Sequence, residues 1–415
     1  MARVLGPNRI VVGRDPRASG PALQSAFESG VAAEGVDVED AGVLPTPALA
    51  AMSEAHDVPA AVITASHNPH TDNGVKVFAS GGRKIVESVQ SAIEAELRRI
   101  ASATPSGSIP RRAGSVVRSP DPIGWYVDRC VALFEPDALA GSRVVLDTSN
   151  GAMSVAAPRT FRALGADVVT LNDAPDGTNI NRDCGATSPS ALCDFVGRMN
   201  RADVAFAFDG DGDRVIAVDE LGHVVDGDRL LALSAIDRKR RGRLAGGVVV
   251  ATVMANLGFH RAMEAAGIQV VTTAVGDRFV LDAMDEGGFV LGGEQSGHII
   301  HRDMATTGDG LLAAIDAAIL VKRSGRAFSG LASGVMTAYP QVLRNVRVAR
   351  RPADPAAEMS VEIARESEAL GASGRVLVRA SGTEPVVRVM VEAPSEALAD
   401  AAVERLCRVA SDRFG

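Results

Sequence analysis

One order of elements recurs three times along the chain, at residues 9–69, 142–213 and 246–298. Each copy has a β-prone apolar run, then a helix-like stretch, and later a second apolar run that enters a loop rich in glycine or serine. The uninterrupted apolar runs 60–63 and 248–251 suit strands that are covered on both faces. In such sheets, ligands gather at the carboxyl ends of the strands, so the three loops are expected to face one cleft.

We therefore predict an α/β fold with three tandem α/β domains of similar topology, a small C-terminal α+β domain, and one central cleft. The length of 415 residues is sufficient for several domains. The segment 104–115, rich in proline and arginine, is expected to be a linker. The expected domains are 1–113 with the loop 64–76, 114–223 with the loop 209–214, 224–338 with the loop 293–298, and 339–415 with the loop 379–385.

Composition excludes several classes of function. The net charge of −8 argues against a nucleic-acid binder that works by bulk charge. The four cysteines show neither metal-site spacing nor a pairing signal, which indicates a reducing compartment. No secretory segment opens the chain, and its most apolar run, 246–258, is far too short for a membrane span. We expect a cytoplasmic enzyme without membrane or nucleic-acid partners.

Three aspartates alternate in "DGDGDR": Asp209, Asp211 and Asp213. Like charges this close repel one another unless a cation lies among them. A calcium-binding EF-hand loop would account for Glu220 at its twelfth position, but it needs glycine where Arg214 stands, and the flanks are strand-like. A metal-free Asp-Gly turn is the other alternative. We favour a loop that follows a strand and holds Mg²⁺, with Arg214 and the metal sharing a phosphate.

The loop "TASHNPHTDNGVK" (64–76) places Ser66 after a strand, with His67 beside it and Lys76 ten residues later. A serine close to basic groups is a candidate nucleophile or phosphate carrier. Taken alone, each residue has an ordinary alternative: a serine in a turn, a structural histidine and a surface lysine.

Two further loops suit a phosphosugar. In "RASGTEP", the Arg379 fork and the hydroxyl and amide groups of Ser381, Gly382 and Thr383 suit a phosphate, although a plain polar hairpin is the alternative. In "GEQSGH", residues 294 and 296 point the same way on a strand-like path and suit neighbouring sugar hydroxyls. Together, the four loops indicate phosphoryl transfer on a phosphosugar.

These four loops, in this order and spacing, resemble the signature loops of the α-D-phosphohexomutase superfamily, and the resemblance covers essentially the whole chain. Further stretches are similar to bacterial phosphoglucosamine mutases: 175–189, 251–258, 275–280, 292–300, 306–310 and 339–343. The resemblance implies an isomerase, an intramolecular phosphotransferase. It would interconvert glucosamine 6-phosphate and glucosamine 1-phosphate through a phosphoserine and a 1,6-bisphosphate, supplying UDP-N-acetylglucosamine for peptidoglycan.

The resemblance also implies roles for individual residues. The catalytic group would be Ser66, Lys76, His67, Arg17 (in "GRDPRASG") and His298. The Mg²⁺ ligands would be the phosphorylated Ser66 with Asp209, Asp211 and Asp213. Substrate would be bound by Arg214, Glu294, Ser296, Arg379, Ser381, Gly382, Thr383 and Arg388.

One departure from the family pattern concerns the beginning of the chain. Family members open with a segment resembling "FGTDGIRG" and a helix, whereas this sequence opens with "MARVLGPN", which resembles the end of that helix. We expect a longer natural chain. The alternatives are a phosphomannomutase or phosphoglucomutase of the same fold, or a non-catalytic phosphosugar-binding remnant. A monomer and a dimer both remain open.

Overall fold

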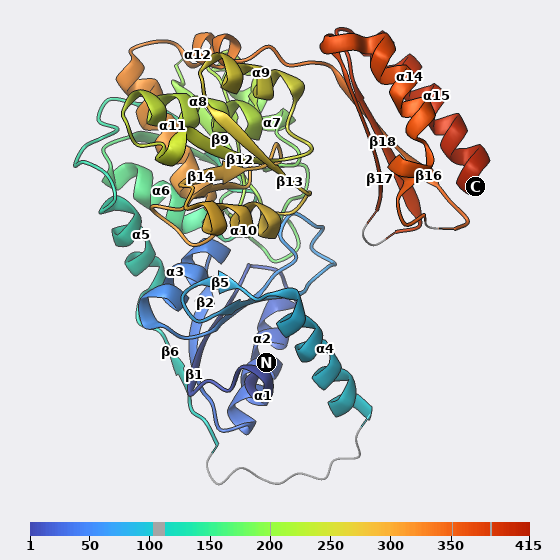
Figure 1. The fold of residues 1–415 in the computed structure, drawn as a ribbon. Helices are drawn as coiled ribbons and strands as arrows, with labels where there is room; N and C mark the ends of the chain where they lie inside the picture. The colour runs from blue at the N-terminus through green and yellow to red at the C-terminus, as the bar shows by residue number, and fades with distance from the viewer. Residues whose placement is uncertain (103–112, 200, 351, 382–383) are drawn as a thin grey trace. The chain divides into compact units, whose positions relative to one another are not determined.

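The computed structural model describes residues 1–102, 113–199, 201–350, 352–381 and 384–415, so most of the expected linker lies outside the described residues. The chain forms two compact units (Figure 1). The first combines Met1–Met254 with Ile268–Gly334, and the second combines Ala255–Gly267 with Val335–Gly415. The four domain boundaries expected from the sequence stay predictions.

Three sheets of the first unit share one strand order. The first sheet runs β5 (Arg83–Lys84), β4 (Val75–Ala79), β3 (Ala60–Ile63), β1 (Arg9–Arg14), β2 (Asp37–Val43), β6 (Val116–Arg118). The second runs β11 (Val224–Val225), β10 (Val215–Val218), β9 (Val204–Phe208), β7 (Arg143–Asp147), β8 (Asp167–Leu171). The third runs β15 (Ile299–His301), β14 (Leu291–Gly293), β12 (Val248–Thr252), β13 (Gln269–Thr273). The predicted α/β class and the repeated topology are confirmed.

The strands at the centre of these sheets are buried on both faces, as their apolar runs predicted. All five residues of β9 and all five of β12 are buried. Because successive side chains point to opposite faces, this pattern requires helices on each side. On the first sheet these helices are α2 (Gly20–Ala33) and α3 (Thr46–His56), which both pack on β1.

The first unit contains further helices. They are α1 (Ala2–Leu5), α4 (Glu87–Ser102), α5 (Pro122–Val131), α6 (Met153–Ala163), α7 (Ser190–Arg198), α8 (Gly227–Arg240), α10 (Asp277–Gly287), α11 (Gly310–Ser324) and α12 (Phe328–Val335), whose last residue lies in the second unit, with a 3-10 turn at Ala245–Gly247.

Three functional loops leave the sheets at equivalent places. In each sheet, one strand pairs in parallel with the central strand and antiparallel with the next strand along the chain. The loop with Ser66 joins β3 to β4, the loop with Asp209 joins β9 to β10, and the loop with Glu294 joins β14 to β15. Each repeat therefore places a different candidate functional loop at the same topological position.

The second unit is an antiparallel sheet of β16 (Gln341–Arg347), β18 (Val386–Glu392) and β17 (Arg375–Ala380), with β18 in the middle. Its helices are α9 (Leu257–Ala265), α13 (Pro355–Glu358), α14 (Ser360–Leu370) and α15 (Glu396–Phe414), with a 3-10 turn at Gly371–Ser373. Valines of β18 pack with Val403 and Leu406 of α15 to form its core.

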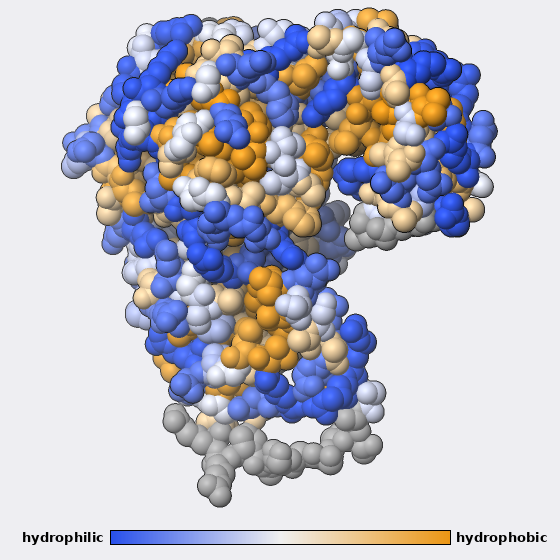
Figure 2. All heavy atoms as spheres, viewed as in Figure 1, coloured by the Kyte–Doolittle hydropathy of each residue, from blue (hydrophilic) through white to orange (hydrophobic). Residues whose placement is uncertain are grey.

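Hydrophilic side chains cover much of the face drawn in Figure 2, with apolar patches between them. Within the described part of the chain, every helix is too short or too polar to cross a membrane.

Candidate active site

Ser66 is held in an unusual backbone conformation. Its φ of +51° lies in the left-handed region, which disfavours a side chain by about 1–3 kcal/mol. Its hydroxyl donates to Oδ2 of Asp209 over 2.6 Å, and Nδ1 of His67 lies 3.5 Å from the same hydroxyl. The structure thus brings the predicted phosphate carrier directly to the predicted metal loop.

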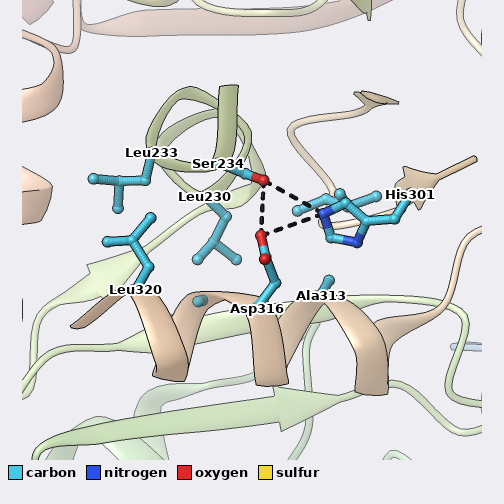
Figure 3. A pocket seen from close by; sticks show the side chains of 9 residues that line it. Leu230, Leu233, Ser234, His301, Ala313, Asp316 and Leu320 are labelled. Atoms are coloured by element: carbon cyan, nitrogen blue, oxygen red, sulfur yellow. Dashed lines mark hydrogen bonds and ion pairs between the residues drawn. The ribbon is translucent and has the colours of Figure 1, made fainter. Parts of the chain in front are cut away.

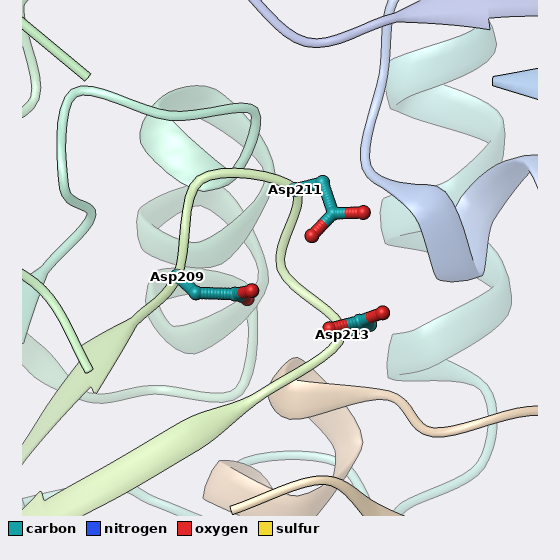
Figure 4. A group of neighbouring side chains, drawn as sticks. All are labelled: Asp209, Asp211 and Asp213. Carbon is teal, nitrogen blue, oxygen red and sulfur yellow. The ribbon is translucent and has the colours of Figure 1, made fainter. Parts of the chain in front are cut away.

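The three aspartates of the metal loop lie around one point (Figure 4). One carboxylate oxygen from each of Asp209, Asp211 and Asp213 lies within 4.8 Å of the others, and all three residues are buried. The intervening glycines are required by the geometry. Gly212 has φ +76°, and a Cβ on Gly210 would approach the carbonyl oxygen of Ser66 to 2.7 Å.

Lys76 neutralises part of this charge. Its ammonium lies 2.6 Å from Oδ2 of Asp211 and 2.8 Å from Oδ2 of Asp213. Burial alone would lower the pKa of Lys76, but these two carboxylates outweigh it and raise the pKa above its ordinary value. Burial and the charges of the other two aspartates raise the pKa of Asp209 well above its ordinary value.

The donor set fits a divalent cation. Three buried carboxylates face two basic side chains, Lys76 and Arg214, so acidic groups outnumber basic ones at the centre of the loop. Among the described residues, Oδ1 of Asp211 and Oδ1 of Asp213 have no hydrogen-bond partner. Oxygen donors with excess negative charge are what hard cations bind in proteins. The site can therefore hold a metal cofactor.

Two basic side chains beside the triad differ in charge. Nε of Arg214 lies 3.9 Å from Oδ1 of Asp213, and the pKa of Arg214 is raised by the surrounding carboxylates despite its burial. Burial and the positive charge of Arg214 lower the pKa of His67, so its imidazole is neutral at pH 7. Arg214 therefore supplies a permanent positive charge at the site, where a phosphate would need it.

The loop with Glu294 lies against the metal loop. His298 is 2% exposed, with Nδ1 3.7 Å from Asp213 Oδ1 and Nε2 3.5 Å from Oδ2 of Asp277. Asp277 also forms an ion pair with Lys84 of β5. Glu294 accepts a hydrogen bond from the amide of Gly276, while Ser296 is exposed. Three strand-end loops therefore converge on one site.

Arg17 lies beneath the phosphoserine loop and is 0% exposed. Its Nε pairs with Asp15 at 2.8 Å. Its two terminal nitrogens donate to four backbone carbonyls of that loop, those of Ser66, Asn68, Pro69 and Asp72. Every donor direction of its guanidinium is thus used within the protein, which indicates an organising role for this loop.

Four residues that sequence reasoning missed belong to the site. Thr46 donates to Asp211 over 2.5 Å, and Asn181 donates to the carbonyl of Ser66 over 2.8 Å. Asp277 lies 3.5 Å from Nε2 of His298 and forms an ion pair with Lys84. For Asn181 and Asp277, the signal was their place in the family-like stretches 175–189 and 275–280.

The sheet of the second unit carries a pair of facing arginines. Arg379 and Arg388 stand directly opposite each other on β17 and β18, and their Nε atoms have no hydrogen-bond partner among the described residues. Burial and the charge of Arg388 lower the pKa of Arg379. Facing like charges destabilise a sheet, and one counter-charge is already present, because Nη2 of Arg388 lies 3.7 Å from Oε2 of Glu384. Ser381 follows and is buried, while the predicted ligands Gly382 and Thr383 lie outside the described residues.

A second polar cluster is structural. Ser234, His301 and Asp316 meet at a cavity of about 10 Å³ between α8, β15 and α11 (Figure 3). A hydrolytic triad needs its acid and its serine on different imidazole nitrogens. Here Nε2 of His301 faces both, at 3.4 Å from Ser234 Oγ and 3.6 Å from Asp316 Oδ2. The cavity has room for about one water, so no substrate reaches it.

Three repeated α/β/α sheets, a small α+β unit and a serine facing an aspartate triad define the α-D-phosphohexomutase class. The chain belongs to the phosphoglucomutase/phosphomannomutase family. The models of its α/β/α domains I, II and III match residues 1–104, 125–222 and 226–339, and the model of its C-terminal domain matches residues 343–409. The protein is accordingly an enzyme of the isomerase class.

Individual relatives show which members of this family the chain is similar to. Phosphoglucosamine mutase of Desulforudis audaxviator is 47% identical over 98% of this chain and 90% of its own length. That of Frankia alni is 48% identical over 96% of this chain and 87% of its own length. A phosphoglucomutase/phosphomannomutase family protein from Burkholderia thailandensis has a similar structure, with a TM-score of 0.81 and 26% identity, covering 100% of this chain and 92% of that protein.

A further structure shares the fold alone, at 19% identity. N-acetylphosphoglucosamine mutase of Aspergillus fumigatus, solved with GlcNAc-6P and magnesium, has a TM-score of 0.67 and covers 89% of this chain and 93% of that one.

Proposed function

We propose that the protein interconverts glucosamine 6-phosphate and glucosamine 1-phosphate through a phosphorylated Ser66 and a 1,6-bisphosphate intermediate. The observation that carries the proposal is the 2.6 Å contact between Ser66 and Asp209, made by two loops that leave equivalent strands of different sheets. Near-full-length relatives at 47% and 48% identity that are phosphoglucosamine mutases support this substrate.

Mg²⁺ is the proposed metal, held by Asp209, Asp211, Asp213 and the phosphate on Ser66. When bound, it would neutralise charge on the transferring phosphoryl group. Arg214 would add a second positive charge to the same group. Small hard cations prefer carboxylate oxygens, which are the donors that this loop offers.

The reaction has two phosphoryl transfers, one from Ser66 to the sugar and one from the sugar back to Ser66. In the first half, the bond from phosphorus to the Ser66 oxygen breaks and a bond to a sugar hydroxyl forms. The proton of that hydroxyl is balanced by protonation of the Ser66 oxygen. Lys76, whose raised pKa keeps it protonated, would give a proton to the Ser66 oxygen and recover one from the sugar hydroxyl, and the second half would run in the opposite direction. The intermediate then presents its other phosphate to Ser66.

The remaining predicted residues would orient the sugar. Glu294 and Ser296 are proposed to bind ring hydroxyls, with His298 beside them. Arg379, Arg388, Ser381 and the loop that follows are proposed to hold the phosphate that does not react. The facing positions of Arg379 and Arg388 on neighbouring strands support this assignment.

Steady-state turnover with three substrates tests the proposal. We expect kcat/KM with glucosamine 6-phosphate to exceed the values with glucose 1-phosphate and mannose 1-phosphate. Preference for either neutral sugar would instead identify a phosphoglucomutase or phosphomannomutase. Phosphosugar binding without turnover would identify a non-catalytic binding protein.

A further inference from the structure

Two side chains from different sheets hold the same two carbonyl groups of the phosphoserine loop. Nη2 of Arg17 donates to the carbonyl oxygens of Ser66 and Asn68, over 2.8 and 2.9 Å. Nδ2 of Asn181 donates to the same two oxygens, over 2.8 and 3.1 Å. Arg17 lies between β1 and α2, and Asn181 lies between β8 and α7. We call this pair of side chains the carbonyl clamp.

The clamp acts on the strained residue itself. The left-handed backbone of Ser66 persists only where its surroundings hold it. The amide of Ser66 donates to Oγ1 of Thr64, which donates in turn to Asp15, the partner of Arg17. The amide and the carbonyl of Ser66 are therefore both fixed.

Asn181 is the member of the clamp that comes from the sheet of the metal loop. Its own φ is +58°, and its amide donates to the carbonyl of Ser149 over 2.9 Å. A Cβ on Gly210 would lie 2.8 Å from Nδ2 of Asn181 and 2.7 Å from the carbonyl oxygen of Ser66. The carboxamide is thus wedged between the phosphoserine loop and the metal loop.

We propose that Asn181 is a positioning residue for phosphoryl transfer. By holding the Ser66 carbonyl from the metal-loop side, it sets the distance between Ser66 Oγ and Asp209 Oδ2. A phosphoryl group on Ser66 is then aimed at the aspartate triad. This inference rests on the proposed function, because it presumes that Ser66 carries a phosphoryl group. It assigns Asn181 no contact with substrate and no chemistry of its own.

Two substitutions test it. Asn181→Ala removes the donor, and Asn181→Asp keeps the shape but turns the donor into an oxygen that repels both carbonyls. The matched control is Asn73→Ala: the Asn73 carboxamide links the same loop to Ser19 over 2.9 Å without touching Ser66. We expect kcat to fall about a hundredfold in both Asn181 variants, as for a reacting group misplaced by about 1 Å. KM should stay within about twofold, since substrate contacts remain.

A second measurement separates positioning from folding. Dephosphorylated protein is mixed with glucose 1,6-bisphosphate, and phosphate uptake on Ser66 is followed by intact mass. Uptake should slow in parallel with kcat in both Asn181 variants, and both should remain folded. Asn181→Ala should unfold at a lower temperature because of its φ of +58°, whereas the unfolding of Asn181→Asp should stay close to that of Asn73→Ala. The inference is overturned if both variants, folded, keep the kcat of the control, or if KM rises while kcat does not change. Failure of the proposed function would appear in the unsubstituted protein, as no turnover and no phosphate on Ser66.

Discussion

The Ser66 hydroxyl and the Asp209 carboxylate lie 2.6 Å apart although 143 positions separate them in sequence. If Ser66 carries the phosphoryl group, purified protein should contain a phosphorylated fraction whose mass increment maps to Ser66. Ser66→Ala should reduce turnover by more than about 10³-fold, because the variant lacks the hydroxyl that would carry the phosphate. Its thermal unfolding should stay close to that of the unsubstituted protein. Substantial turnover by phosphate-free Ser66→Ala would exclude the carrier role.

Asp211→Asn should weaken the metal site with little loss of fold. Removing one of three mutually repelling charges relieves repulsion in the metal-free protein, while the affinity for Mg²⁺ falls about tenfold or more with the ligand charge. The measurement is turnover against Mg²⁺ concentration. Asp173→Asn is the matched control, because Asp173 also accepts a threonine hydroxyl, that of Thr170, at an exposed place. Equal activity with Ca²⁺ would contradict the assignment of Mg²⁺, whose smaller octahedral site suits phosphoryl transfer.

Lys76→Met should affect activity and metal binding in opposite directions. Turnover should fall about 10²- to 10⁴-fold with loss of the proton donor. Without metal, the variant should unfold at a lower temperature because Asp211 and Asp213 lose their cation. Added Mg²⁺ should raise its Tm more than that of the unsubstituted protein, since the ion no longer competes with an ammonium. Lys322→Met, at the exposed end of α11, is the control. A smaller Mg²⁺-induced shift in Lys76→Met would show that the lysine does not compete with the metal.

Asp309→Asn should change the pH dependence of stability. Asp309 caps α11 and accepts the hydroxyl of Tyr126, and burial raises its pKa to about 6. Because this pKa lies above the unfolded value, ionisation of Asp309 lowers the free energy of unfolding as pH rises from about 4 to 6. The full cost, about 3 kcal/mol, persists above pH 6.

Asparagine retains the cap without the buried charge. The variant should therefore be more stable than the unsubstituted protein at pH 8 and gain less stability on acidification to pH 5, measured by urea unfolding. Asp226→Asn, at the half-buried cap of α8, controls for the cap itself. A variant less stable than the unsubstituted protein at pH 8 would refute this account.

The sequence predicted the repeated sheets well because their evidence is local. Uninterrupted apolar runs identify buried strands, and polar glycine-rich segments after them identify the functional loops. Pairing was harder to predict. The bounds of β16, for example, are set by its pairing with β18, which joins Gln341 to Glu392 and Arg347 to Val386. The helical segment that follows is divided at Met359, a fully buried core residue between α13 and α14.

The missed residues of the site depend on long-range contacts. In a loop rich in glycine and asparagine, Asn181 reads as a turn former, and nothing local reveals that its carboxamide reaches Ser66. Thr46 lies between two prolines, and its hydroxyl reaches Asp211 only through the tertiary fold. Arg17 was expected to be a catalytic residue. Its guanidinium is buried because it donates to four backbone carbonyls that lie about fifty residues later in the sequence. Its predicted catalytic role stays a prediction.

The carbonyl clamp also has a consequence for protein synthesis. Ser66 leaves the ribosome 115 residues before Asn181 and 143 residues before Asp209. Its sheet can form while the chain is still growing, since domains fold from the N-terminus as they emerge. The left-handed turn at Ser66 then lacks half of its support until the second sheet has assembled. In a ribosome-bound chain that ends before Asn181, Arg17 is therefore the only member of the clamp that can hold the Ser66 carbonyl.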